Sequence, residues 1–265
     1  MPNKQKQETY VLCYDMHFPH TDWSTYKALL SFIEQNDVDG FIFGGDQFSN
    51  DCISHHTRGK PMLRDKGAYK KEEEQFVKKV LDPLDGLLGD ITKVWIEGNH
   101  DNWEQQLVEE QPELDGIQRG PSLYSDSPGS LELSERGWQF VPCGKSFKKG
   151  FLTFIHGETL TGIGNQAGVM HSKKAVESYC ANVVYGHVHS PQSFTKVLPH
   201  DETQKWQSWC MPILGNVNPG YLRNKPTAWL NGFGVVEFRG DGTFNVYPVI
   251  CIGGKCSYGG KVYGG

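Results

Sequence analysis

Residues 93–101 read Lys-Val-Trp-Ile-Glu-Gly-Asn-His-Asp, an apolar stretch that runs directly into a glycine, an amide, an imidazole and a carboxylate. The stretch from Lys93 to Ile96 predicts a short buried strand. The cluster Gly98-Asn99-His100-Asp101 follows where that strand ends. In open α/β sheets, ligands bind beyond the carboxyl ends of the strands. This cluster therefore predicts a functional site at one edge of a sheet.

Four more polar clusters follow short apolar stretches in the same way. They are Asp15-Met16-His17 after 9–14, Gly45-Asp46 after 41–43, His156-Gly157 after 152–155, and Gly186-His187-Val188-His189 after 182–185. Apolar residues at helical spacing occupy 26–33 and 77–84, between the first three strands. This alternation predicts an α/β fold with parallel strands joined by right-handed crossovers. We expect the five clusters to meet at one rim.

The rest of the chain extends this pattern. Helices are expected over 103–111 and 171–181, and strands near 206–214, 233–238 and 243–250. The last two strands are expected to form a hairpin through Gly240-Asp241-Gly242. Residues 112–137 are rich in Pro, Gly and Ser and predict a long loop excursion, and 253–265 predicts an irregular C-terminal tail. Since no repeat or linker is evident, 1–265 is expected to form a single domain.

Composition excludes several classes of protein. The chain has 265 residues, with 26 Lys and Arg against 31 Asp and Glu, which gives a formal net charge of −5 and argues against a generically basic nucleic-acid-coating protein. No apolar run approaches the roughly 18 residues of a membrane span, and Met1 to Glu8 shows no secretory signal. The seven cysteines form no C-x-x-C pair. A cytoplasmic protein with reduced thiols and no membrane contact is expected.

The side chains in the five clusters are those that bind divalent metals. They comprise Asp15, His17, Asp46, Asn99, His156, His187 and His189. Oxygen and nitrogen ligands without a thiolate suit borderline divalent ions. Seven ligands fit two ions better than one, because an open catalytic site rarely uses more than three or four protein ligands. A bridging carboxylate would bring the ions to roughly 3.5–4 Å, the separation found in two-metal phosphoester hydrolases.

The ordered motifs D-x-H, G-D, G-N-H-D, H and G-H-x-H, from Asp15 to His189, resemble the calcineurin-like metallophosphoesterases. In size, the chain is also similar to the phage and prophage members of that family. The resemblance implies an α/β fold built as a two-sheet β-sandwich flanked by helices. It implies two divalent ions, with manganese expected and iron, nickel, cobalt or zinc accepting the same ligands.

The resemblance also implies roles for single residues. Asp15, His17 and His189 match one metal site, Asn99, His156 and His187 match the other, and Asp46 matches the bridging carboxylate. His100 matches a histidine that contacts the phosphate and protonates the leaving group, and Asp101 is expected to orient that imidazole. Two features depart from the family. The family often continues G-D with an Asp and sometimes an Arg, but here Gln47-Phe48 follow Asp46 and no Arg comes soon after, which argues against the phosphoprotein phosphatase branch. Glu158 has no assigned role.

A basic segment follows the Asp46 strand. Residues 55–71 hold six Lys and Arg against one Asp, and Arg58, Lys60 and Arg64 are the candidate contacts to a substrate phosphate backbone. The alternative is a solvated loop that leads into a helix.

These observations favour a two-metal phosphodiesterase that acts on nucleic acid, DNA or RNA, or on nucleotides through a metal-bound hydroxide. The alternatives are a phosphomonoesterase on a nucleotide or small phosphate, and a non-catalytic metal-binding scaffold. The scaffold is disfavoured because all seven ligand types and His100 are present together. No G-x-S-x-G elbow, P-loop or dinucleotide fingerprint supports another mechanism.

Overall fold

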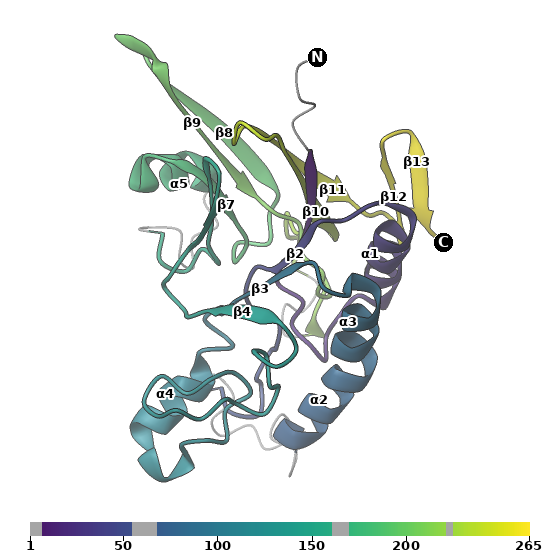
Figure 1. Ribbon diagram of the computed structural model, residues 1–265, viewed down its shortest axis with the longest axis vertical. Coiled ribbons are helices and arrows are strands. Elements are labelled where there is room, and N and C mark those ends of the chain that lie inside the picture. Colours follow the sequence, from purple (N-terminus) through teal and green to yellow (C-terminus); the bar gives the residue numbers. More distant parts are fainter. Residues whose placement is uncertain (1–6, 55–67, 161–169, 221–224) are drawn as a thin grey trace.

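The computed structural model describes residues 7–54, 68–160, 170–220 and 225–265, and it has two β-sheets with helices on their outer faces (Figure 1). The first sheet has six strands in the order β11-β10-β1-β2-β3-β4. Their bounds are β1 Glu8–Cys13, β2 Gly40–Phe43, β3 Thr92–Ile96, β4 Trp138–Val141, β10 Gly232–Phe238 and β11 Phe244–Ile250. Strands β1, β2 and β3 are parallel, as predicted, and β4 adds a fourth parallel strand that was not predicted. On the other side of β1, β10 and β11 pair antiparallel.

The second sheet has five strands in the order β5-β6-β7-β9-β8. Their bounds are β5 Phe147–Lys149, β6 Leu152–Phe154, β7 Asn182–Tyr185, β8 Gln192–Leu198 and β9 Asp201–Cys210. One buried apolar cluster joins the sheets, with Leu12 and Val94 from the first and Phe154 and Val184 from the second. Burial of these side chains between the sheets confirms the predicted two-sheet sandwich.

Helices cover the outer faces of both sheets. Against the first sheet lie α1 (Trp23–Gln35), α2 (Ala68–Phe76), the π-helical turn η3 (Val77–Leu81) and α3 (Asp82–Leu88), with α1, α3 and α2 stacked along one side in Figure 1. Helix α5 (His171–Tyr179) packs Ala175 and Val176 on β7. Among the described residues, no helix is long and apolar enough to span a membrane.

The segment after β3 begins with α4 (Trp103–Glu110) and the 3-10 turn η4 (Pro112–Leu114). Residues 115–137 then run as turns and loop, as the excursion predicted over 112–137 would, until β4 begins at Trp138. The loop is nevertheless anchored, because Leu131 and Leu133 are buried in the core against the first sheet and Arg119 is only 1% exposed.

The prediction of an irregular tail over 253–265 is wrong. Strands β12 (Lys255–Tyr258) and β13 (Lys261–Gly264) pair as an antiparallel hairpin. Its inner side chains, Cys256 and Tyr263, join the core, and the Tyr263 ring packs 5.0 Å from that of Phe32 in α1. The hairpin forms because alternate residues of the tail bury apolar surface against α1.

Asp22 caps the start of α1, and its loss is expected to destabilise the protein. The Asp22 carboxylate accepts hydrogen bonds from Thr25 N (2.8 Å) and Ser24 Oγ (2.6 Å). An Asp22→Ala change should lower the free energy of unfolding by about 1 kcal/mol at pH 7. Burial opposes ionisation, but these hydrogen bonds outweigh it and lower the pKa of Asp22 below its ordinary value.

The stabilisation that the ionised Asp22 gives the folded protein is therefore fully present at pH values above the unfolded-state pKa of about 3.8. It is lost as the pH falls through the lower pKa of the folded state. Urea unfolding at pH 7 and pH 3 should show a smaller difference between variant and wild type at the acid pH. The exposed Asp37 provides an Asp37→Ala control that should change stability little at either pH. An Asp22 effect that does not depend on pH would contradict the assignment of the charged cap.

Candidate metal centre

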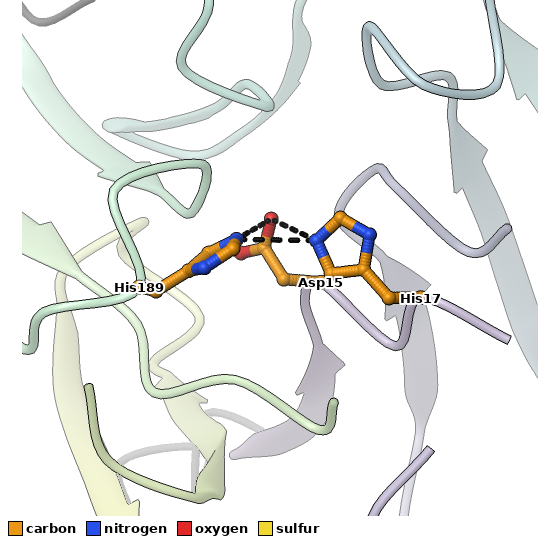
Figure 2. A group of neighbouring side chains, drawn as sticks. All are labelled: Asp15, His17 and His189. Atoms are coloured by element: carbon orange, nitrogen blue, oxygen red, sulfur yellow. Dashed lines mark hydrogen bonds and ion pairs between the residues drawn. The ribbon is translucent and has the colours of Figure 1, made fainter. Parts of the chain in front are cut away.

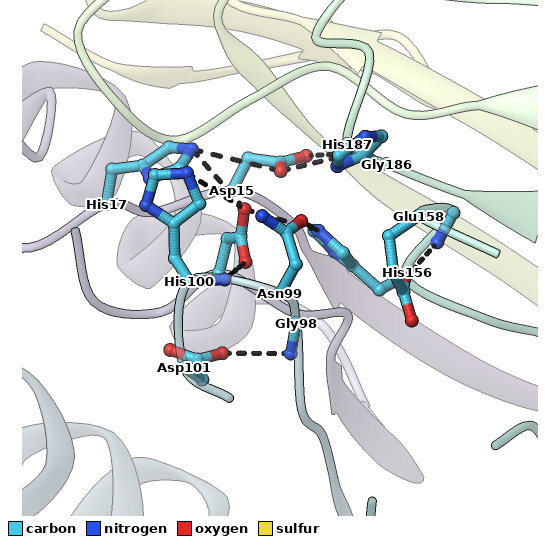
Figure 3. A network of polar contacts seen from close by, with 12 residues as sticks. Asp15, His17, Gly98, Asn99, His100, Asp101, His156, Glu158, Gly186 and His187 are labelled. Atoms are coloured by element: carbon cyan, nitrogen blue, oxygen red, sulfur yellow. Dashed lines mark hydrogen bonds and ion pairs between the residues drawn. The ribbon is translucent and has the colours of Figure 1, made fainter. Parts of the chain in front are cut away.

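The predicted metal ligands meet where strands of both sheets end. Asp15 follows β1, Asp46 follows β2, and Asn99 follows β3, while His156 and His187 follow β6 and β7 of the second sheet. Figure 3 shows side chains from both sheets turned toward one another. The five clusters therefore lie at one rim, as the strand–cluster pattern predicts.

The backbone at this rim is strained. Five of the seven predicted ligands have positive φ angles between 48° and 64°: Asp15, His17, Asp46, His187 and His189. Side chains with a Cβ rarely adopt this conformation, and such strain is concentrated at functional sites. The surrounding structure therefore holds these residues in place at a cost in free energy.

Asp15, His17 and His189 form the first group of ligands (Figure 2). His189 Nε2 lies 3.2 Å from both Asp15 Oδ1 and His17 Nε2, and the Asp15 carboxylate is fully buried. Burial, helped by the neighbouring His100, lowers the pKa of His17 to about 3. His17 is therefore neutral near pH 7 and has a ring lone pair available for a metal.

Asp46, His156 and His187 form the second group. His156 Nε2 lies 3.2 Å from Asp46 Oδ2 and 3.1 Å from Asn99 Oδ1, which brings the predicted amide ligand into the same group. His156 Nδ1 lies 3.1 Å from Gly44 O. Because a carbonyl only accepts hydrogen bonds, Nδ1 carries a proton, and Nε2 points into the site. Burial lowers the pKa of His156, but the charge of Asp46 outweighs it and raises the pKa to about 10, so an ion bound at Nε2 would displace a proton.

The Asp46 carboxylate lies between the two groups. Its Oδ2 is 3.9 Å from His17 Nε2, which belongs to the first group, and 3.2 Å from His156 Nε2, which belongs to the second. Burial raises the pKa of Asp46, but the neighbouring His156 and His100 outweigh it, so the pKa lies well below its ordinary range. The ionised carboxylate, only 2% exposed, therefore lies beside ligand nitrogens of both groups.

Two glycines allow this close packing. A Cβ on Gly45, whose φ is +108°, would lie 2.2 Å from His156 Nδ1, and a Cβ on Gly98 would lie 2.2 Å from Asp46 Oδ1. The glycines of the G-D and G-N-H-D motifs are therefore needed because a metal-ligand side chain passes against each one.

His100 also shares a third group of possible ligand atoms with His17 and Asp46, and its ring is fixed on several sides. The ring stacks on the Trp103 indole at a centroid distance of 4.0 Å, and its Nδ1 donates to Ser49 O over 2.9 Å. This bond puts the proton on Nδ1 and turns Nε2 toward the site, 3.9 Å from Asp46 Oδ2. The His100 side chain is 28% exposed, so a substrate can reach it.

The predicted role of Asp101 needs correction. In place of Asp101, the Ser49 carbonyl contacts the His100 ring. The buried Asp101 carboxylate accepts from Gln47 N (3.3 Å), Phe48 N (3.0 Å) and Gly98 N (3.0 Å). Asp101 therefore ties the loop after β2 to the loop after β3. The motif alone does not reveal this, because a main-chain carbonyl acceptor leaves no mark in the sequence.

Glu158, which had no predicted role, closes a loop beside His156. Its carboxylate accepts from Gly157 N (3.0 Å), Gly144 N (3.0 Å) and Cys143 Sγ (3.3 Å).

Trp229 forms part of the wall of the site, because the centroid of its ring lies 4.4 Å from that of the His189 ring. The candidate substrate contacts Arg58, Lys60 and Arg64 lie outside the described residues.

The described residues fit divalent ions. Each group brings its oxygen and nitrogen ligand atoms within 4.8 Å of one another, and the donors contain no thiolate. In the first group, two imidazole Nε2 atoms lie only 3.2 Å apart, an arrangement that an ion between their lone pairs would stabilise. The same residues also fit a second ion, because the Asp46 carboxylate lies beside ligand nitrogens of both groups.

No protein-family model and no curated protein matches the chain. Solved structures do match. Vacuolar protein sorting 29 from Cryptosporidium parvum has a TM-score of 0.50 and 11% identity, covering 98% of this chain and 99% of that one. A metallophosphoesterase from Sphaerobacter thermophilus has a TM-score of 0.40 and 16% identity, covering 90% and 87%. A dimetal phosphatase from Danio rerio has a TM-score of 0.41 and 10% identity, covering 86% and 92%.

Proposed function

We propose that this chain, which has the calcineurin-like metallophosphoesterase fold, is a metal-dependent hydrolase of phosphate esters. The observation that carries the proposal is the position of Asp46, whose buried carboxylate lies between two groups of possible metal ligands and beside the partly exposed His100. A scaffold needs neither the shared carboxylate nor a histidine with one ring nitrogen fixed and the other turned toward the site.

The chain divides the work of the site among its residues. One ion would be held by Asp15, His17 and His189, and the other by Asn99, His156 and His187. Asp46 would contact both ions. Two bound divalent ions would supply Lewis-acid charge for the phosphate oxygens and lower the pKa of water. His100 would act in its imidazolium form, keeping the Nδ1 proton on Ser49 O and giving the Nε2 proton to the leaving oxygen, which leaves a neutral ring protonated on Nδ1.

Within this class we propose a phosphodiesterase that acts on nucleic acid or nucleotides, with manganese as the metal. The local charge of +5 over 55–71 supports a polyanionic substrate. A phosphomonoesterase would use the same ligands and the same histidine, so the choice between the two depends on the walls around the metal centre.

Paired chromogenic esters, one a phosphodiester and one a phosphomonoester, test the proposal. We expect Mn²⁺-dependent hydrolysis of the diester with a higher kcat/KM than of the monoester, and loss of both activities in the His100→Ala variant. A preference for the monoester would overturn the diesterase assignment and leave the hydrolase. The protein could bind metal and yet hydrolyse neither ester nor labelled DNA, RNA or nucleotides. That result would favour a non-catalytic metal-binding scaffold.

A further inference from the structure

The turn after Phe48 holds His100 at two points. Ser49 O accepts the ring proton of His100 Nδ1 over 2.9 Å. The side chain of the next residue, Asn50, donates from Nδ2 to the main-chain carbonyl of His100, also over 2.9 Å. Two adjacent residues thus hold both the backbone and the ring of the proposed proton donor.

Asn50 is suited to this place in its backbone as well as its side chain. It is fully buried and has a φ of +52°, a left-handed conformation that asparagine adopts more readily than most residues. Its carbonyl accepts from Ile53 N (3.1 Å) and Ser54 N (3.0 Å), which starts a new turn. The chain therefore changes direction at Asn50, directly after the carbonyl that fixes the ring.

Arg119, which belongs to the loop excursion, fixes the Asn50 amide. Arg119 Nη1 donates to Asn50 Oδ1 over 2.6 Å, and Nη2 donates to Tyr69 O over 2.8 Å. The guanidinium lies 4.0 Å from the centroids of both the Phe48 and the Tyr69 rings. Because arginine only donates, the amide oxygen must face it, and the amide nitrogen must face His100.

Two carboxylates accompany the buried charge of Arg119. Glu104 Oε1 lies 3.6 Å from Nη1, and Glu72 Oε2 lies 3.4 Å from Nη2. Glu104 Oε2 also accepts from Arg119 N over 2.9 Å, which fixes the main chain of the excursion against α4. The guanidinium is thus held by charge, by hydrogen bonds and by ring packing, and it has little freedom to release the amide.

We propose that Asn50, fixed by Arg119, is a positioning residue that aims the His100 imidazole at the metal centre. The inference rests on the proposed function for its catalytic consequence and on the contacts above for its geometry. The Asn50 amide accepts from Arg119 and donates to His100 O at the same time, which an ionised carboxylate cannot do. The loop excursion thereby contributes to the site through Arg119.

Asn50→Asp is the variant that separates positioning from folding. Aspartate has nearly the same size, tolerates positive φ and still accepts from Arg119. When ionised it cannot donate to His100 O or to Glu104 Oε1, to which Asn50 Nδ2 donates over 2.9 Å and 3.4 Å. We expect kcat to fall on the order of tenfold to a hundredfold, as for a small misplacement of a catalytic group, with KM and the number of bound ions unchanged. Glycine adopts positive φ without strain, so Asn50→Gly should likewise lower kcat and leave KM and the number of bound ions unchanged.

Asn36→Asp is the matched control. Asn36 Nδ2 also donates to a main-chain carbonyl, Phe32 O at 2.7 Å, but at the end of α1. This variant should lose stability and keep the kcat of the wild type. Equal losses of kcat in Asn50→Asp and Asn36→Asp, or loss of metal from the Asn50 variants, would overturn the positioning role.

A measurement that needs no turnover separates this inference from the proposed function. In protein labelled with ¹⁵N-histidine and loaded with diamagnetic Zn²⁺, the His100 Nδ1–H group should give a hydrogen-bonded signal. That signal should shift or exchange faster in Asn50→Asp and stay as in the wild type in Asn36→Asp. An unchanged His100 signal in both Asn50 variants would refute the inference, whereas absent turnover in the wild type would refute only the proposed function.

Discussion

Replacing His100 by alanine is expected to lower kcat by roughly 10²–10⁴-fold while the protein keeps its divalent ions. The ring lies next to the metal groups, with Nε2 3.9 Å from Asp46 Oδ2, but Nδ1 is bonded to Ser49 O. Removing the ring would take away the proton donor without removing any of the seven predicted ligands. Steady-state kinetics together with metal analysis of the purified variant checks both parts of this expectation.

The exposed His200, in the turn between β8 and β9, provides the control. A His200→Ala variant should match the wild type in kcat and in metal content. A His100→Ala variant that loses metal in proportion to activity would make His100 a ligand instead of a proton donor. A variant with unchanged kcat would show that another group, or solvent, protonates the leaving oxygen.

The parallel core of the fold was predictable because its signals are local. β1, β2 and β3 are short apolar stretches with a polar cluster directly after each. Other strands carry weaker signals. β4, at the sheet edge, is only four residues long and exposes Gln139, and β8 alternates between half-buried and exposed residues. Such strands are defined mainly by the partner they pair with, which the sequence does not show.

The tail shows how composition can mislead. Its glycines predict an irregular segment, but Gly259 and Gly260 have φ angles of +56° and +79° and form the turn between β12 and β13. A Gly-Gly pair between two strands is itself a hairpin signal. The tertiary contact that makes this hairpin stable, between the Tyr263 and Phe32 rings, joins residues at opposite ends of the chain.

The sequence predicts which side chains gather at the site, but it does not predict the groups that hold them in place. The ligand motifs combine residue types that rarely occur together, so their order is informative. Ser49 O, Gly44 O and the Asn50–Arg119 pair are different, because a carbonyl is common to every residue and Arg119 lies 69 positions from Asn50. Which of these groups fixes an imidazole is decided by tertiary packing alone.

Asp46→Asn is expected to weaken the binding of both ions together, each by at least about a hundredfold, which is the upper range for loss of an outer-sphere partner. The Asp46 carboxylate lies beside ligand nitrogens of both groups, 3.2 Å from His156 Nε2 and 3.9 Å from His17 Nε2. An amide offers one neutral oxygen in place of the charge that would be shared by the two ions. Calorimetric titration with Mn²⁺ should therefore lose both binding events, and hydrolysis should fall with them.

Asp15→Asn is the matched comparison, because Asp15 is equally buried but belongs to one group only. The Asp15→Asn change should weaken the binding of one ion and leave the affinity for the other close to that of the wild type. Comparing the two variants therefore distinguishes a ligand shared by both ions from a ligand of one ion. Circular dichroism of both proteins would show that the fold persists, since either change keeps the size of the side chain. An Asp46→Asn protein that still binds one ion with normal affinity would refute the bridge: Asp46 would then belong to a single site, and the two groups would have to bind their ions independently.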